Sequence, residues 1–247
     1  MNKSAYPAKT LYVIVDNREY TITVQYNIRQ KHIRVRINSD GQITLSAPAG
    51  TTRRKIQSVV HNKEGWLKTK IKETHMALEK NNPTERVFVD GFPFQVEFLF
   101  SDTLTPHVEV DYALQKAYVY GRENSIQSIA SVVEKWLRRE AKQRLPEYAK
   151  KVALEIGISY GKLFLRNQKT RWGSSSTLGN ISLNWRTVMA PKAVQRYLII
   201  HELVHQRQMN HSPQFWQQVA HFCPNYAEYE SWLKENRALM GLFRATI

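Results

Sequence analysis

The sequence predicts an α+β fold, in which a β-rich N-terminal region with a helical insert, residues 1–122, precedes a more helical domain, residues 123–247. Short apolar runs, several alternating with polar residues, dominate the first half of the chain, as in half-buried strands. Apolar residues spaced three and four apart dominate segments near residues 126–156 and 192–240, as in amphipathic helices. A chain of 247 residues with 42% hydrophobic residues is long enough for one large domain or two small ones.

The N-terminal region contains two groups of predicted strands around a helical segment. The first group is punctuated by turns at Asp16-Asn17 and Ser39-Asp40-Gly41. The helical segment spans residues 51–80, with a break near Gly65. Asp90-Gly91 predicts a tight hairpin in the second group. The predicted strands are 11–15, 20–26, 33–37, 43–47, 86–89, 92–100, 107–110 and 117–120.

The C-terminal region begins with a predicted long helix, residues 125–156, which Pro146 should kink or divide and Gly157 should end. Two strands at 162–170 and 180–184 follow, joined by a Gly- and Ser-rich loop, residues 171–179. Three helices complete the chain. They are predicted at 192–209, 213–222 and 226–240.

The composition bounds the compartment and the partners. No apolar run reaches the roughly 18 residues of a membrane-spanning helix, and the N-terminus lacks the apolar core of a signal peptide, so we expect a cytoplasmic protein that does not enter a membrane. One cysteine, Cys223, excludes an internal disulfide. The formal net charge of +15 fits attraction to nucleic acid or nucleotides, and equally a merely well-solvated surface.

The candidate metal-binding and catalytic residues lie in the segment YLIIHELVHQRQMNHSPQFW. It contains the pattern H-E-x-x-H at His201, Glu202 and His205. Histidines four residues apart lie on one face of a helix and can bind one metal ion, while the intervening glutamate can reach a metal-bound water as a general base. Aliphatic neighbours predict that this helix is buried, where two histidines and a glutamate are costly unless a metal satisfies them.

The third metal ligand is predicted to be His211. On a continuous helix His211 would lie about 80° from the direction of His201, so the helix must end first. Asn210 suits a helix C-terminus, and Ser212-Pro213 suits the start of a new helix, which places His211 in the turn. Three histidines plus water form an open catalytic zinc site. Glu228 and Glu230 are the alternative third ligands.

The string RWGSSSTLGNISLNWRTVMAP followed by the segment above resembles the YgjP-like metal-dependent hydrolases (domain of unknown function 45), which are related to SprT-like and Wss1-like peptidases and to minimal gluzincin-type peptidases. The resemblance is close over residues 170–216 and looser over the N-terminal half. It implies a zincin-like catalytic domain with an H-E-x-x-H helix packed on a small sheet. It also implies Zn²⁺ held by His201, His205 and His211, with Glu202 as the base. The family usually reads W-G-S-C, whereas this chain has Ser175 in place of the cysteine.

Two further residues are candidates by analogy with zincins. In these enzymes an edge strand near the active-site helix pairs with an extended peptide substrate. By this analogy residues 179–184 line the cleft, and Arg171 or Asn184 steadies the developing oxyanion. The alternative is that Arg171 is a structural ion-pair partner and that Trp172 and Trp185 are core aromatic residues.

Three functions are therefore weighed. The first is a zinc metallopeptidase acting on unfolded protein or peptides. The second is a phosphoanhydride hydrolase acting on nucleotides, with Arg171, Arg186 and Arg207 holding phosphate oxygens. The third is a non-enzymatic nucleic-acid-binding protein with a structural metal. The metal motif itself does not separate the first two. An arginine-rich cleft would favour phosphate, and an exposed strand edge beside the metal would favour peptide.

Overall fold

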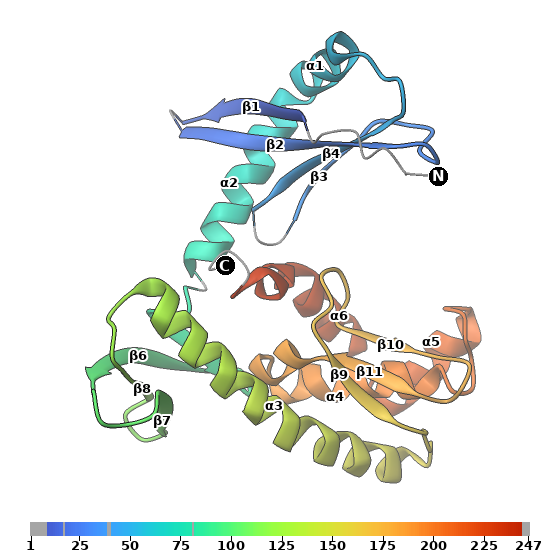
Figure 1. Cartoon of the computed structure of the whole chain (residues 1–247). Coiled ribbons are helices and arrows are strands. Elements are labelled where there is room, and N and C mark those ends of the chain that lie inside the picture. Colours follow the sequence, from blue (N-terminus) through green and yellow to red (C-terminus); the bar gives the residue numbers. More distant parts are fainter. Residues whose placement is uncertain (1–8, 17, 39–40, 81, 244–247) are drawn as a thin grey trace, which may run out of the picture. The chain divides into compact units, whose positions relative to one another are not determined.

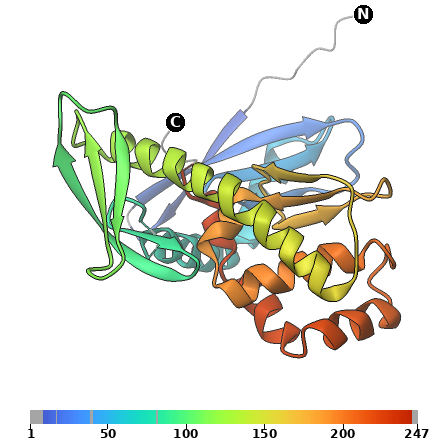
Figure 2. The same ribbon diagram turned by 90° about the horizontal axis from the view of Figure 1, so that it is seen from below.

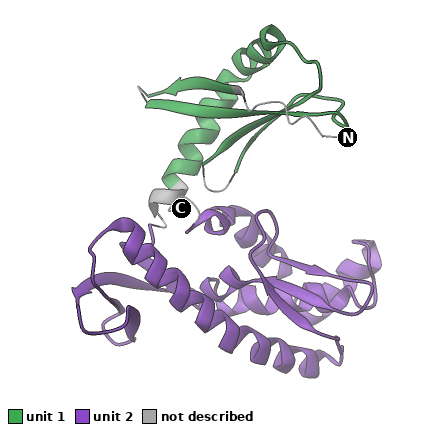
Figure 3. Cartoon of the chain, viewed as in Figure 1, with its two compact units in different colours: residues 1–80 green, residues 81–247 purple. Residues whose placement is uncertain are grey.

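The computed structural model describes residues 9–16, 18–38, 41–80 and 82–243, which form an α+β fold (Figure 1). The turns predicted at Asp16-Asn17 and Ser39-Asp40-Gly41 include positions outside the described residues. The chain forms two compact units, residues 1–80 and 81–247 (Figure 3). The boundary predicted between residues 122 and 123 therefore falls within the second unit, just before its long helix.

The first unit is a four-stranded sheet with two helices. The strand order is β1-β2-β4-β3, in which β2 and β4 are parallel and the outer pairs are antiparallel. Alternate residues of β2 and β4 enter the core, where Ile22 and Leu45 are fully buried. The helices are α1 (Arg53–Asn62) and α2 (Glu64–Lys80), and the break between them lies at Lys63 rather than Gly65. The strands are β1 (Lys9–Val15), β2 (Arg18–Asn27), β3 (Arg34–Ile37) and β4 (Ile43–Pro48).

The second unit contains two sheets and a long helix. The first sheet has the order β5-β6-β8-β7, and its β5–β6 hairpin turns at Asp90-Gly91, both with positive φ, as predicted. The second sheet has the order β10-β11-β9. The strands are β5 (Arg86–Val89), β6 (Phe92–Phe100), β7 (His107–Asp111), β8 (Lys116–Gly121), β9 (Leu163–Arg166), β10 (Gly173–Ser175) and β11 (Ile181–Asn184).

Helix α3 (Ile126–Ile156) contacts both sheets of this unit and runs between them (Figure 2). Ser125 caps its N-terminus, and Gly157 ends it in the left-handed conformation, as predicted. The helix passes Pro146 without being divided. The remaining elements are the 3₁₀ helix η1 (Trp185–Met189), α4 (Lys192–Val204), α5 (Pro213–Phe222), α6 (Tyr226–Glu235) and the 3₁₀ helix η2 (Arg237–Gly241).

Among the described residues no helix is both long and apolar enough to cross a membrane. The cytoplasmic location stays a prediction.

Strand β3 alternates between exposed arginines and partly buried apolar residues. Arg34 and Arg36 are exposed, while Val35 and Ile37 are half-buried. Binding of nucleic acid by such basic surfaces also stays a prediction.

Candidate metal centre

Helix α4 carries the first part of the site. Its aliphatic side chains are buried, which holds the helix in the interior and brings His201 and Glu202 with it. His205 follows as the C-cap residue, still in helical conformation, one turn after His201. Glu202 and His205 are buried, with exposed fractions of 4% and 8%. The buried aliphatic residues around them are Leu198, Ile199, Ile200, Leu203 and Val204.

The chain turns sharply after α4 and so brings His211 back to the helix. The amides of Gln206 and Arg207 donate to the carbonyls of Leu203 and Val204, which close the last turn. The predicted helix end near residue 209 is therefore wrong, because the turn begins at His205 rather than at Asn210. Ser212 then caps α5 by accepting from the amide of Phe215, and Pro213 begins that helix, as predicted.

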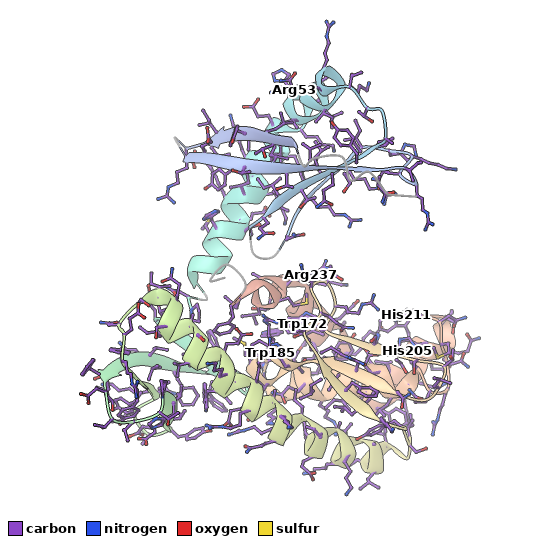
Figure 4. The ribbon with its side chains drawn as sticks, viewed as in Figure 1. Arg53, Trp172, Trp185, His205, His211 and Arg237 are labelled. Atoms are coloured by element: carbon purple, nitrogen blue, oxygen red, sulfur yellow. The ribbon has the colours of Figure 1, made fainter. Side chains whose placement is uncertain are left out.

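The three histidines meet at one point. Their nearest ring nitrogens all lie within 4.8 Å of one another, and the Nε2 atoms of His201 and His211 are 3.1 Å apart. Two imidazole nitrogens that share a tetrahedral ion at about 2.1 Å would lie roughly 3.4 Å apart. Figure 4 labels two of the three histidines, His205 and His211. The donor set and its spacing therefore fit one divalent metal ion with an open fourth position.

The protonation states also suit a metal. The Nδ1 atom of His205 is 2.9 Å from the carbonyl oxygen of Gln208, so an Nδ1–H that donates there leaves Nε2 free as a ligand. Burial, followed by the two neighbouring imidazoles, lowers the pKa of His201 to about 3. Burial likewise lowers the pKa of His205. Both rings are therefore neutral at pH 7, which is the metal-binding form.

The carboxyl group of Glu202 is buried. Burial raises the pKa of Glu202 to about 8, against a smaller opposite effect of the Arg171 charge. Its Oε2 atom makes no hydrogen bond within the described part of the chain. A carboxyl group poised near neutral pH beside three histidines matches the requirement for a general base.

Gly173 of β10 provides the space that Glu202 occupies. A Cβ atom on Gly173 would lie 2.3 Å from Oε1 and 2.8 Å from Cδ of Glu202, well inside van der Waals contact. The end of α4 is joined to the same strand where Gln206 Nε2 donates to Ser175 Oγ at 2.5 Å. Strand β10 therefore positions the carboxyl group, and its Ser175 makes a polar contact with Gln206, just after α4.

Phe215 packs against all three histidines. Its ring centroid lies 5.0 Å from that of His201, 4.5 Å from that of His205 and 4.8 Å from that of His211, and the side chain is fully buried. Neither Gly173 nor Phe215 was assigned a role from the sequence. The signals were present, since Gly173 follows Trp172 in the R-W-G-S string and Phe215 follows the N-H-S turn.

Replacing Phe215 with leucine is expected to weaken metal affinity by about tenfold or more, because groups that orient ligands typically contribute 10–100-fold. The smaller side chain loses ring contacts with the three histidines while keeping an apolar core residue. Competition with a chelator of known affinity measures the change. Phe222→Leu, a change of the same kind on the half-buried end of α5, serves as the control. Equal metal affinity in all three proteins would contradict the role of Phe215.

Arg171 and Asn184 have different surroundings in the structure. Arg171 is exposed, and its positive charge favours the ionised form of the Glu202 carboxyl group. Asn184 is fully buried, donates to the carbonyls of Gln168 and Arg171, and accepts from the amide of Arg186. These contacts favour a structural role for Asn184, which holds the loop that carries Arg171. A catalytic role of either residue stays a prediction.

The other predicted arginines do not gather at the metal centre. Arg186 is fully buried and donates to Asn167 and to the carbonyl of Leu242, while Arg207 donates to the carbonyl of Gly157. Glu230, an alternative third ligand, pairs with Lys234 at 2.9 Å. Among the described residues, the group that could hold a metal ion consists of the three histidines.

The strand that contains residues 181–184 is not an edge strand of its sheet. Strand β11, which contains residues 181–184, is central in its sheet and pairs with β10 and β9 on its two sides. It therefore has no free edge for a substrate. Strand β10 lies at the edge and contacts α4. That residues 179–184 line the cleft stays a prediction, although residues 181–184 lie in a central strand.

Fold and site together define the class of metal-dependent hydrolases, with a buried glutamate beside an open set of three histidines. The chain belongs to the YgjP-like family, since the model of the YgjP-like metallopeptidase domain matches residues 31–236. A search of curated proteins finds no match. The crystal structure of the metallopeptidase zymogen of Pyrococcus abyssi abylysin shares 22% identity at a TM-score of 0.34, over 36% of this chain and 90% of that one.

Proposed function

We propose that this protein is a zinc-dependent peptidase with a zincin-like catalytic domain, in which His201, His205 and His211 hold the metal and Glu202 is the general base. The observation that carries the proposal is the convergence of three histidines on one point beside a buried carboxyl group. Zinc, when bound, would lower the pKa of a water and polarise the scissile carbonyl.

Each residue of the proposed site has its own role in the reaction. Glu202 accepts the proton of the attacking water and returns it to the leaving amine, and burial, which raises its pKa to about 8 in the metal-free site, makes it a stronger base. Gly173 leaves room for that carboxyl group, and the Gln208 carbonyl orients His205. The exposed guanidinium of Arg171 is the candidate for stabilising the oxyanion, with Asn184 supporting its loop.

Peptide is favoured over nucleotide by the surroundings of the metal centre. The edge strand β10 contacts α4, so an extended substrate that pairs with it would pass beside the base. Of the three arginines expected to hold phosphate, Arg186 is buried on other partners and Arg207 donates to a backbone carbonyl. This arrangement fits an unfolded protein or a peptide as substrate better than a nucleoside triphosphate.

The test is to load the purified protein with zinc and incubate it separately with an unfolded protein and with nucleoside triphosphates. We expect cleavage of the unfolded protein and intact nucleotides. Hydrolysis of the nucleotides alone would replace the peptidase with a phosphoanhydride hydrolase. Cleavage of neither substrate by a zinc-loaded protein would count against both.

A further inference from the structure

A pocket of about 250 Å³ adjoins the metal centre, and the proposed proton transfers do not use it. His201 and Glu202 form part of its wall, so it opens beside the reacting atoms of the proposed hydrolysis. A water molecule takes about 30 Å³ in the liquid, so this space is large enough for a side chain rather than a single water. The described residues from which it is built come from β10, α4, α6, η2 and the loop before β10.

Four buried apolar or aromatic side chains line the pocket. Trp172, Tyr197, Leu198 and Leu233 line it, and each is at most 8% exposed. The indole of Trp172 donates to the carbonyl of Leu233 at 3.0 Å, which fixes one wall across two elements. The ring of Tyr197 packs on that of Tyr229, with centroids 6.3 Å apart. The walls are therefore held by neighbouring contacts and form a built cavity.

The lysine and the arginine that line the pocket are engaged with other partners. Lys234 pairs with Glu230 at 2.9 Å, and Arg237 donates to the carbonyl of Thr170 at 3.2 Å. Lys234 is 65% exposed, which places its charge at the mouth. Figure 4 labels Arg237 and Trp172, which both line the pocket. An anionic substrate group would have to compete for these two cations, whereas an apolar group gains from the walls directly.

We propose that this pocket is a specificity site that binds a large apolar side chain of the substrate, at a residue adjoining the scissile bond. This proposal rests on the proposed peptidase function, because His201 and Glu202 are shared between the pocket and the metal centre. The enzyme should therefore cleave preferentially beside residues such as phenylalanine or leucine. A side chain as small as that of alanine would leave the walls in contact with water and would add little binding free energy.

The first test narrows the pocket. Thr170 is an exposed lining residue, so Thr170→Trp adds bulk at the pocket without a change in the core. With blocked peptides that differ only in phenylalanine or alanine at one position, the unaltered enzyme should cleave the phenylalanine peptide with a kcat/KM at least about tenfold higher. Thr170→Trp should lose most of this preference. Leu154→Trp, on the exposed side of α3, should keep it.

The second test measures binding without turnover. Zinc-loaded Glu202→Gln should bind the phenylalanine peptide at least about tenfold more tightly than the alanine peptide, and adding Thr170→Trp should abolish the difference. Equal binding of the two peptides, or a preference that survives Thr170→Trp, would overturn the pocket assignment even if the enzyme is a peptidase. Discrimination in binding with no cleavage by the unaltered zinc-loaded protein would instead refute the peptidase function and leave the pocket as a binding site.

Discussion

Replacing Glu202 with glutamine is expected to leave the metal bound and to lower hydrolysis by about 10²–10⁴-fold, the usual contribution of a general base. Glutamine has nearly the same shape but accepts no proton at neutral pH. The three histidines are untouched, so metal content should match that of the unaltered protein. Initial rates with an unfolded protein as substrate, together with elemental analysis, measure both quantities. Retained activity would remove the general-base assignment.

The same variant has an expected effect on the stability of the metal-free protein. The pKa of Glu202 is raised to about 8 in the fold, from about 4.5 when unfolded. Between these values the folded state binds the extra proton, so stability falls as the pH rises from about 4.5 to about 8. Glutamine has no such proton to lose. Glu202→Gln should therefore gain stability relative to the unaltered protein across this window, on the order of a few kcal/mol above pH 8.

Chemical denaturation of both metal-free proteins at pH 5 and pH 9 checks this expectation. The burial of His201 has a separate effect, because its pKa of about 3 makes both proteins lose stability as the pH falls from about 6.5. This effect cancels in the comparison of the two proteins. A difference in stability that does not grow between pH 5 and pH 9 would show that the Glu202 carboxyl group is better solvated than its 4% exposure indicates.

Replacing Gly173 with alanine is the second change with a large expected effect. The added methyl group would lie 2.3 Å from Oε1 of Glu202, so the carboxyl group must move by about 1 Å or more. A misplacement of about 1 Å can cost roughly 10²-fold in rate. We therefore expect about a hundredfold loss of hydrolysis with metal content unchanged. Steady-state kinetics and elemental analysis of the purified variant test both parts.

Gly65→Ala is the matched control for this change. A Cβ atom on Gly65 would contact nothing within 4 Å, so activity should be unchanged. The double variant Gly173→Ala with Glu202→Gln decides whether Gly173 acts through the base. If it does, the double variant is no slower than Glu202→Gln alone. An additive loss would mean that the methyl group disturbs substrate binding or another part of the site.

The elements predicted correctly are those whose signals are local. Ser212-Pro213 marks the start of α5, Gly157 the end of α3, and Asp90-Gly91 the β5–β6 hairpin. Each depends on the conformational preferences of a few adjacent residues, which the sequence displays directly. The convergence of His211 with the two helical histidines needs a helix end and a new helix start; Ser212-Pro213 marks the start, whereas α4 ends earlier than Asn210 predicted.

The features missed depend on contacts between distant segments. Strand β10 consists of Gly173, Ser174 and Ser175, residues with weak strand preference, and its strand character comes from pairing with β11. The fit of Glu202 against Gly173 likewise joins α4 to β10 and has no counterpart in either segment alone. The central place of β11 was also hidden, because strand order in a sheet is a tertiary property.

The central claim is that His201, His205 and His211 together hold one metal ion, and its most direct test is the zinc content of the unaltered protein and of His211→Ala. Both proteins are supplied with zinc, dialysed identically and analysed for metal, with His221→Ala as a control on the neighbouring helix. We predict about one zinc per chain in the unaltered protein and in the control, and almost none in His211→Ala. Equal zinc in all three, or none in the unaltered protein, would contradict the three-histidine centre.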